Sequence, residues 1–277
     1  MGICRFCGQE AGLFKSVHKE CESAHLNGKN SIVDKVSQAI TTSANFSNLD
    51  TEIANIGRSS FVSKDELDEL YYLGFDKAVE SILGDGLISI EEEQKILNFK
   101  KHFNLDENTL SNRDSFQKIL KALILRDILD GRTPGSRLDI AGTIPFLLQK
   151  DEKIFWLFQN VEFYERQTKT TFQGRSQGVS IKIAKGLYYR TGIFKGNPVT
   201  NEQMTLLGKG MLALTNENLY FASTTKSLKI PYNKLISITP FLDGIGLQKD
   251  GVSSKPQIFK DIDGWFTYNL ISNLNKL

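Results

Sequence analysis

The chain has 277 residues, of which 40% are hydrophobic and 24% charged, and at roughly 150 residues per domain it is long enough for about two cores. Its 22 Gly and 6 Pro are too few for a collagen-like or low-complexity chain, and no run of 18 apolar residues predicts a membrane span. The first six residues hold no apolar run typical of a secretory signal, so we expect a cytoplasmic protein.

The formal net charge of +2 conceals an asymmetry between the two halves of the chain. Residues 1–135 hold 16 Lys and Arg against 21 Asp and Glu, whereas residues 136–277 hold 18 against 11. The basic second half is compatible with a surface that meets anions. It falls short of the dense Lys/Arg runs that are typical of nucleic-acid or polybasic membrane segments.

All three cysteines lie near the N-terminus, in the pattern Cys4-x2-Cys7-x10-His18-x2-Cys21. Three thiolates and one imidazole at this spacing suit a four-coordinate structural zinc ion, and Gly8 allows the tight turn that follows Cys7. His25 competes with His18 for the fourth position. Idle cysteines, or a disulfide with one thiol left over, are the plainer alternatives. The sequence predicts a zinc-binding module over residues 1–27.

The next part of the chain predicts helices. Residues 28–60 are polar and read as a linker with one helix over 31–44. Three helices are expected over 64–83, 90–103 and 114–130, the first with a capping box at Ser63 and Glu66. The turn around Gly84 and the stretch 131–135 separate and end them. We therefore expect an all-α domain over residues 61–135.

The turn between the first two of these helices has two interpretations. Asp85, Gly86, Ser89 and Glu92 match the second half of an EF-hand loop, which makes Asp85 and Glu92 the first candidates for a second, weak metal site. The first half does not match, because Leu83 supplies no oxygen ligand. The simpler interpretation is that Ser89 caps the following helix and Glu92 reaches back to it.

Residues 85–93 are Asp-Gly-Leu-Ile-Ser-Ile-Glu-Glu-Glu, and over residues 61–129 this block resembles the TerB-like family of bacterial helical domains. The resemblance implies scaffolding, metal-linked or stress-response roles.

Beyond Pro134 the pattern changes to the alternation of short strands. The expected strands are 144–148, 154–164, 179–189, 204–214, 218–223, 227–230, 234–240 and 245–249. An amphipathic helix opens at Asp263 and carries Trp265 and Phe266 in its first turn. Six or more antiparallel strands followed by one helix predict a PH-like β-barrel capped by that helix, over residues 140–277.

Two linked motifs sharpen this prediction. Residues 208–221 contain a Gly-x-Leu-x-Leu-Thr-Asn-x-x-Leu-x-Phe pattern that begins at Gly210, and residues 226–238 continue with Ile230-Pro231 and an Ile-rich strand. They resemble the GRAM branch of PH-like domains, and Phe259, Trp265 and Phe266 continue the resemblance. The fold class expected for the whole chain is α+β multidomain.

The most basic stretch of the second half is the best candidate for an anion-binding or partner-binding surface. On a continuous strand Lys182 and Arg190 would share one face, Lys185 would lie on the other, and Arg175 could join from the preceding loop. The resemblance to PH-like domains implies that such residues can grip phosphoinositide headgroups. A solvated sheet face or a protein contact is the plainer interpretation.

Catalytic motifs are missing from the sequence, which has neither a nucleophile elbow, nor a P-loop, nor a His-Glu-x-x-His zinc motif. We therefore expect a non-enzymatic adaptor that binds a protein partner through its zinc-finger and PH/GRAM-like modules. The combined resemblance implies a bacterial stress or phage-defence setting. A peripheral protein of anionic membranes is the first alternative. A nucleic-acid binder using Arg5, Lys15 and Lys19 is the second.

Overall fold

The computed structural model describes residues 2–42, 46–135, 143–171, 180–184, 187–190, 199–251 and 254–274. For residue 85 and for the strand residues between 168 and 202 it describes the backbone alone. The chain divides into two compact units, Met1–Arg126 and Asp127–Leu277. The segments 1–27, 28–60 and nearly all of 61–135, expected as separate parts, therefore share one unit.

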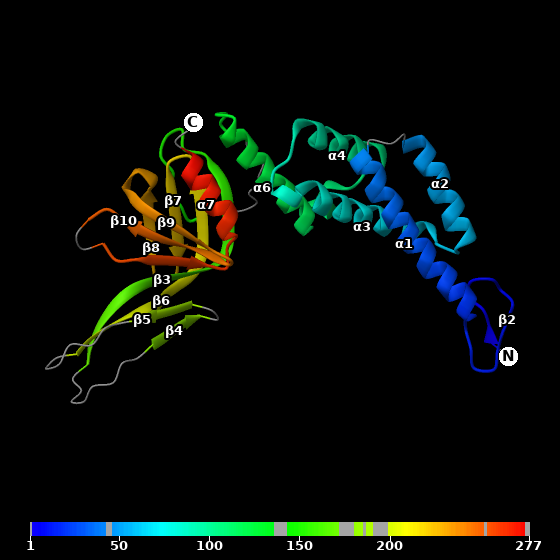
Figure 1. Ribbon diagram of the computed structural model, residues 1–277, viewed down its shortest axis with the longest axis horizontal. Helices are drawn as coiled ribbons and strands as arrows, with labels where there is room; N and C mark the ends of the chain where they lie inside the picture. The colour runs from blue at the N-terminus through cyan, green and yellow to red at the C-terminus, as the bar shows by residue number, and fades with distance from the viewer. Residues whose placement is uncertain are drawn as a thin grey trace. The chain divides into compact units, whose positions relative to one another are not determined.

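The first unit is a small β knot followed by a helical body (Figure 1). Strands β1 (Gly2–Ile3) and β2 (Glu10–Gly12) pair antiparallel in the knot. The helices are α1 (Lys19–Thr42), α2 (Phe46–Ser59), α3 (Lys64–Ile82), α4 (Ile90–His102), α5 (Glu107–Ser111) and α6 (Asp114–Leu129), with a 3-10 turn η1 (Leu83–Asp85) before α4. The three helices expected over 64–130 are confirmed to within one residue at each end.

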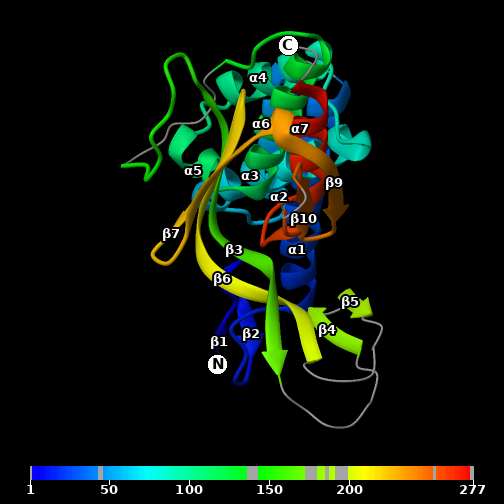
Figure 2. The same cartoon turned by 90° about the vertical axis from the view of Figure 1, so that its left-hand side faces the viewer.

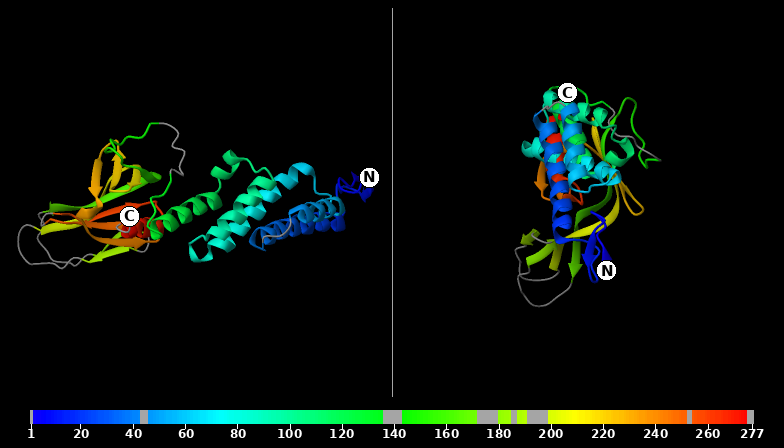
Figure 3. Two further views of the ribbon diagram at one scale, coloured as in Figure 1. Left: turned by 90° about the horizontal axis from the view of Figure 1, so that it is seen from above. Right: turned by 90° about the vertical axis from the view of Figure 1, so that its right-hand side faces the viewer.

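Helices α1 and α3 pack side by side along most of their length (Figure 3). A side chain at Gly74 of α3 would lie 2.3 Å from Val36 Cγ1 of α1, so this crossing requires glycine. The shared core contains Ile32, Val36 and Ile40 from α1, and it extends to Phe75 and Phe99. Apolar residues three or four apart on α1 supply one continuous stripe to this core.

Residues 28–60, expected as a helical and polar linker with one helix over 31–44, are almost all helical where the structure describes them. Residues 19–42 form one helix that begins 12 residues before the predicted start, and α2 occupies most of the remainder. Leu49 and Ile53 of α2 are buried in the same core as α1 and α3. Phe46, Leu49, Ile53 and Ile56 lie three or four residues apart on α2, so its apolar stripe is present in the sequence although the surrounding polar residues favour a linker.

The second unit is a seven-stranded antiparallel sheet with one helix packed on it. Its strand order is β8-β7-β6-β3-β11-β10-β9. The bounds are β3 (Ile154–Thr171), β6 (Val199–Thr215), β7 (Asn218–Ser223), β8 (Ser227–Pro231), β9 (Leu235–Phe241), β10 (Gly244–Lys249) and β11 (Gln257–Lys260), with a 3-10 turn η2 (Tyr232–Lys234) between β8 and β9. The long strands β3 and β6 bend across the sheet (Figure 2).

This sheet is not closed into a barrel, contrary to the sequence-based expectation. Closure would require a ladder between the terminal strands β8 and β9, and none joins them among the residues that the structure describes. Helix α7 (Gly264–Asn273) begins one residue after the expected start at Asp263, whose carboxylate caps it by accepting a hydrogen bond from the Phe266 amide at 3.0 Å. Phe266 packs edge-on against Trp156 of β3, with ring centroids 5.3 Å apart.

Two other predicted strands differ from the structure, and one observed strand was not predicted. Residues 144–148 form no strand, and Phe146 instead packs against the Tyr220 ring at 5.7 Å. The single strand expected over 179–189 is instead two antiparallel strands, β4 (Ser180–Ala184) and β5 (Leu187–Arg190), which pair with each other. The short strand β11 gives no pattern of its own in the sequence.

A buried carboxylate fixes the edge of the sheet where β6 turns into β7. Glu152 is 7% exposed, and its two oxygens accept hydrogen bonds from Thr215 Oγ1 at 2.6 Å, Asn218 Nδ2 at 2.8 Å, Tyr220 Oη at 2.7 Å and the Gln149 amide at 2.9 Å. Burial alone would raise the pKa of Glu152, but these hydrogen bonds outweigh it and lower the pKa to about 2. The Thr-Asn motif of the sequence is thus anchored by a residue about 65 positions earlier.

Replacing Glu152 tests this anchor. Glu152→Gln removes the charge and leaves donors without acceptors, so we expect the free energy of unfolding of the sheet unit to fall by about 2–4 kcal/mol. Chemical denaturation followed by tryptophan fluorescence measures it, because Trp156 and Trp265 both lie in this unit. The exposed Glu217→Gln is the matched control and should change stability by less than about 0.5 kcal/mol.

The same carboxylate predicts a pH dependence. Its folded pKa lies below the ordinary value of 4.5, so its contribution is complete above that pH and is lost as the pH falls toward 2. Denaturation midpoints recorded between pH 6 and pH 2.5 should decline more steeply in the wild type than in Glu152→Gln. Parallel curves for the two proteins would contradict the assignment.

Candidate metal centre

The N-terminal knot is built from tight backbone turns. The Cys4 amide donates to the Gln9 carbonyl at 2.8 Å, and the Gly8 amide donates to the Cys4 carbonyl at 2.9 Å. Gly8 has a φ of 72°, a left-handed conformation that glycine adopts without strain, as the predicted turn requires. These bonds turn the chain back after Cys7 and bring the two thiols of the knuckle together.

The four predicted donors converge on one point. The ligand atoms of Cys4, Cys7, His18 and Cys21 all lie within 4.8 Å of one another. His18 Nδ1 is 3.3 Å from Cys7 Sγ and 3.7 Å from Cys21 Sγ. Tetrahedral zinc with bonds of about 2.0–2.3 Å separates its ligand atoms by about 3.3–3.8 Å, so this cluster could hold a metal ion such as zinc.

The imidazole of His18 is oriented for this role. Its Nε2 lies 2.9 Å from the Glu10 carbonyl oxygen, which can only accept, so Nε2 carries the proton. Nδ1 is then left with a free lone pair that points toward the sulfur atoms. A backbone carbonyl that fixes the tautomer of a ligating histidine is typical of metal sites.

Electrostatics also favour a cation among these donors. Burial alone would raise the pKa of Cys4, but hydrogen bonds from the backbone amides of Cys7, His18 and Phe6 lower it to about 6. Burial and the neighbouring sulfur atoms of Cys7 and Cys4 raise the pKa of Cys21 to about 11. Three thiols in one small volume cannot all become thiolates unless a positive ion joins them.

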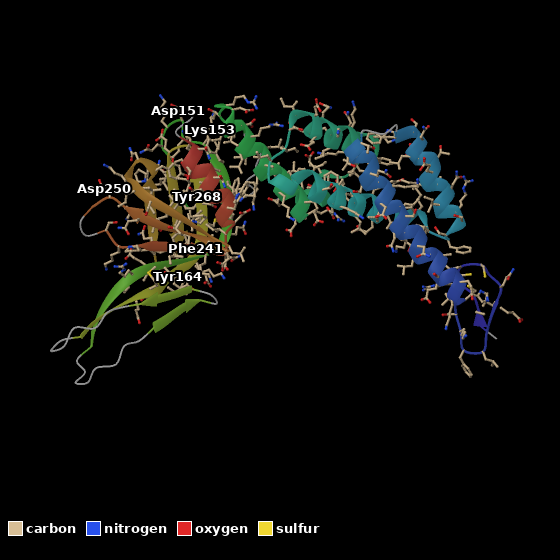
Figure 4. The ribbon with its side chains drawn as sticks, viewed as in Figure 1. Asp151, Lys153, Tyr164, Phe241, Asp250 and Tyr268 are labelled. Carbon is tan, nitrogen blue, oxygen red and sulfur yellow. The ribbon has the colours of Figure 1, made fainter. Side chains whose placement is uncertain are left out.

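Helix α1 carries the second half of the donor set. Cys21 lies in its first turn, and His18 just before it, where the Glu22 amide donates to the His18 carbonyl at 3.0 Å. In Figure 4 the yellow sulfur atoms gather where the knot meets this helix. The donor set therefore ties the β1–β2 knot to a helix that reaches into the core of the first unit.

His25, the alternative ligand, has a different role. Its Nδ1 lies 3.0 Å from the Ser60 carbonyl oxygen, and its Nε2 lies 3.0 Å from Glu66 Oε1. The Phe6 ring packs against it in a tilted arrangement, with ring centroids 4.6 Å apart. His25 thus joins the knot and α1 to the start of α3, through contacts between residues 35 to 41 positions apart that no local pattern predicts.

The turn before α4 is organised by a capping box. The Ser89 amide donates to Glu92 Oε2 at 2.9 Å and the Glu92 amide donates to Ser89 Oγ at 3.2 Å. The Glu92 carboxylate is therefore engaged locally, as the simpler interpretation expects. The side chain of Asp85 lies outside the described residues, so the weak metal site at Asp85 and Glu92 stays a prediction.

The basic stretch expected to bind anions is only partly described. Arg175 and Lys185 lie outside the described residues. Lys182 pairs with Tyr188 and Arg190 pairs with Ser180 between β4 and β5, so they belong to two strands and not to one continuous strand. The interpretation of these residues as a binding surface stays a prediction.

No protein-family model matches this chain, and no curated protein matches it either. Within the part of the chain that the structure describes, no helix is both long enough and apolar enough to cross a membrane. Among the described residues, the cluster at the knot is the one group of three or more His, Cys, Asp and Glu side chains whose donor atoms lie close enough to share a metal ion.

A pair of histidine variants separates the metal centre from its neighbour. Purified wild-type protein should carry about one zinc ion per chain by elemental analysis, and His18→Ala should lose it, with a fall of tenfold or more in metal affinity. His25→Ala should keep the zinc and lose the contacts of His25 with Ser60, Glu66 and Phe6. Loss of zinc from both variants, or from neither, would contradict the assignment.

Proposed function

We propose that this chain is a non-enzymatic adaptor, built from a zinc-stabilised knot, a TerB-like helical body and a PH/GRAM-like sheet unit. Four protein donors close a tetrahedral zinc site and leave no position for a catalytic water, which supports a structural metal. The strand order supports the PH-like assignment. Strands β3, β6, β7 and β8 form one antiparallel group, strands β9, β10 and β11 form a second group that pairs with β3 through β11, and a C-terminal helix follows.

The exposed tip of the knot is the observation that carries the proposal. Phe14 is fully exposed, with a φ of 61°, and Leu13 beside it is 73% exposed. A bulky residue in the left-handed region costs about 1–2 kcal/mol, and an exposed apolar pair gains nothing from burial within the folded chain. Such a tip on a metal-fixed support is suited to insertion into a pocket of a partner protein.

The charge around this tip favours a protein partner over a polyanion. Arg5, Lys15 and Lys19 are exposed, and so are Glu10, Glu20 and Glu22. This balance supplies no basic surface of the kind that nucleic acid or an anionic membrane attracts. We therefore propose protein contact as the function of the knot, with the sheet unit as a second binding module.

Affinity purification of tagged, zinc-loaded full-length protein from the organism that encodes it tests the adaptor function. The wild type should retain a partner at a fixed stoichiometry, and the double variant Leu13→Ser with Phe14→Ser should lose at least nine tenths of it. The matched control is Leu147→Ser, which removes a leucine that is 95% exposed in the sheet unit. Retention of no partner by the wild type would contradict an adaptor.

Salt dependence separates the alternatives. Retention of DNA, RNA or phosphatidylserine vesicles that falls steeply between 50 and 200 mM salt would indicate a polyanion ligand instead. We expect no such retention by the full-length protein.

A further inference from the structure

Strand β9 presents a free edge. Among the described residues it pairs with β10 alone, and it is the last strand in the sheet order. A terminal strand carries backbone N–H and C=O groups that its own sheet does not use. Pro240, which has no N–H, is compatible with such an edge and limits the usable stretch to residues 235–239, about 17 Å long.

A groove of about 910 Å³ runs beside this edge, which is the size of a ligand pocket. Residues 235–238 of β9 line it together with Ile271, Leu274 and Tyr268 of α7, the last of which is labelled in Figure 4. The β6–β7 turn, β8 and η2 complete the lining with residues 216–218, 229 and 231–234. Leu235 and Ile238 are half-buried, so the groove contains apolar surface next to a free backbone edge.

The charged residues that line the groove are two lysines and one glutamate. With its amide oriented to satisfy both neighbours, Gln149 donates to Glu217 Oε2 at 3.2 Å and accepts from Lys229 Nζ at 2.7 Å. Lys234 is exposed at the end of η2, directly before β9, and no described carboxylate forms an ion pair with it. The groove thus carries a cation available to a negative group of a ligand.

We propose that this groove binds an extended peptide of a partner protein, which adds a strand to β9, seats an apolar side chain against α7 and places a carboxylate near Lys234. This inference rests on the proposed adaptor function and names the class of its partner. An extended peptide is the occupant that uses all three features, because strand addition supplies backbone bonds while the groove selects side chains. A lipid headgroup would leave the apolar wall and the strand edge unused.

A displayed library of random 12-residue peptides, selected on zinc-loaded full-length protein, provides the probe. Enriched peptides should share an acidic residue and alternating apolar residues. Hydrogen exchange with an enriched peptide should slow at the amides of residues 236–239. No enrichment over beads without protein, or slowing confined to other strands, would overturn the proposal.

Two variants with matched controls locate the site. Ser272→Trp places an indole in the groove from an exposed position on α7 and should weaken peptide binding at least about tenfold, whereas Ser227→Trp, on β8 outside the groove, should not. Lys234→Glu should weaken binding of acidic peptides by a similar factor, and Lys226→Glu should leave it unchanged. Equal effects of variant and control would overturn the proposal.

The native partner distinguishes this proposal from the adaptor function itself. If the partner is retained by Ser272→Trp but lost from the variant at Leu13 and Phe14, the adaptor stands and the groove proposal fails. If the wild type retains no partner, the adaptor function fails, irrespective of the outcome of the peptide selection. Loss of the partner from Ser272→Trp, with retention by Ser227→Trp, supports both.

Discussion

The convergence of Cys4, Cys7, His18 and Cys21 is the constraint on which the N-terminal part depends. Before α1 begins, only Cys4 and Ala11 among the described apolar residues are buried, which is far too little surface to hold a β knot in one shape. Binding of a structural zinc ion by such ligands is worth about 10–16 kcal/mol in small fingers. The metal can therefore replace the hydrophobic core that this segment lacks.

The knot also depends on the helices behind it. His25 bonds to the Ser60 carbonyl and to Glu66, and Lys29 Nζ reaches the same carboxylate at 3.1 Å. Hydrogen bonds from the Ser63 amide lead the contributions that lower the pKa of Glu66 to about 2. One carboxylate thus caps α3 and fastens α1 to it, so the rigid helical body supports the exposed Phe14.

Sequence reasoning succeeded where a local pattern determines the structure. The convergence of the metal ligands, the capping boxes at Ser63 and Ser89, and the start of α7 next to Asp263 all depend on residues near one another in the chain, and each agrees with the prediction. Sequence reasoning failed where contacts between residues far apart in the chain determine the structure. The start of α1 at Lys19 and the open edge between β8 and β9 follow from tertiary contacts that no short window contains.

Glu152 shows the same limit. It lies in a polar turn that reads as surface, yet it is buried because Thr215, Asn218 and Tyr220 return to it from the far end of a long hairpin. The Thr-Asn pattern is a recognisable sequence motif, but only the folded structure shows that Glu152 is its hydrogen-bond partner. The groove between β9 and α7 also joins segments that lie about 35 residues apart.

X-ray absorption at the zinc edge of the purified full-length protein tests the central claim most directly. The account predicts one zinc ion with three sulfur ligands at about 2.3 Å and one nitrogen ligand at about 2.0 Å. A first shell dominated by oxygen, fewer than three sulfur ligands, or protein that folds with no bound zinc would contradict it.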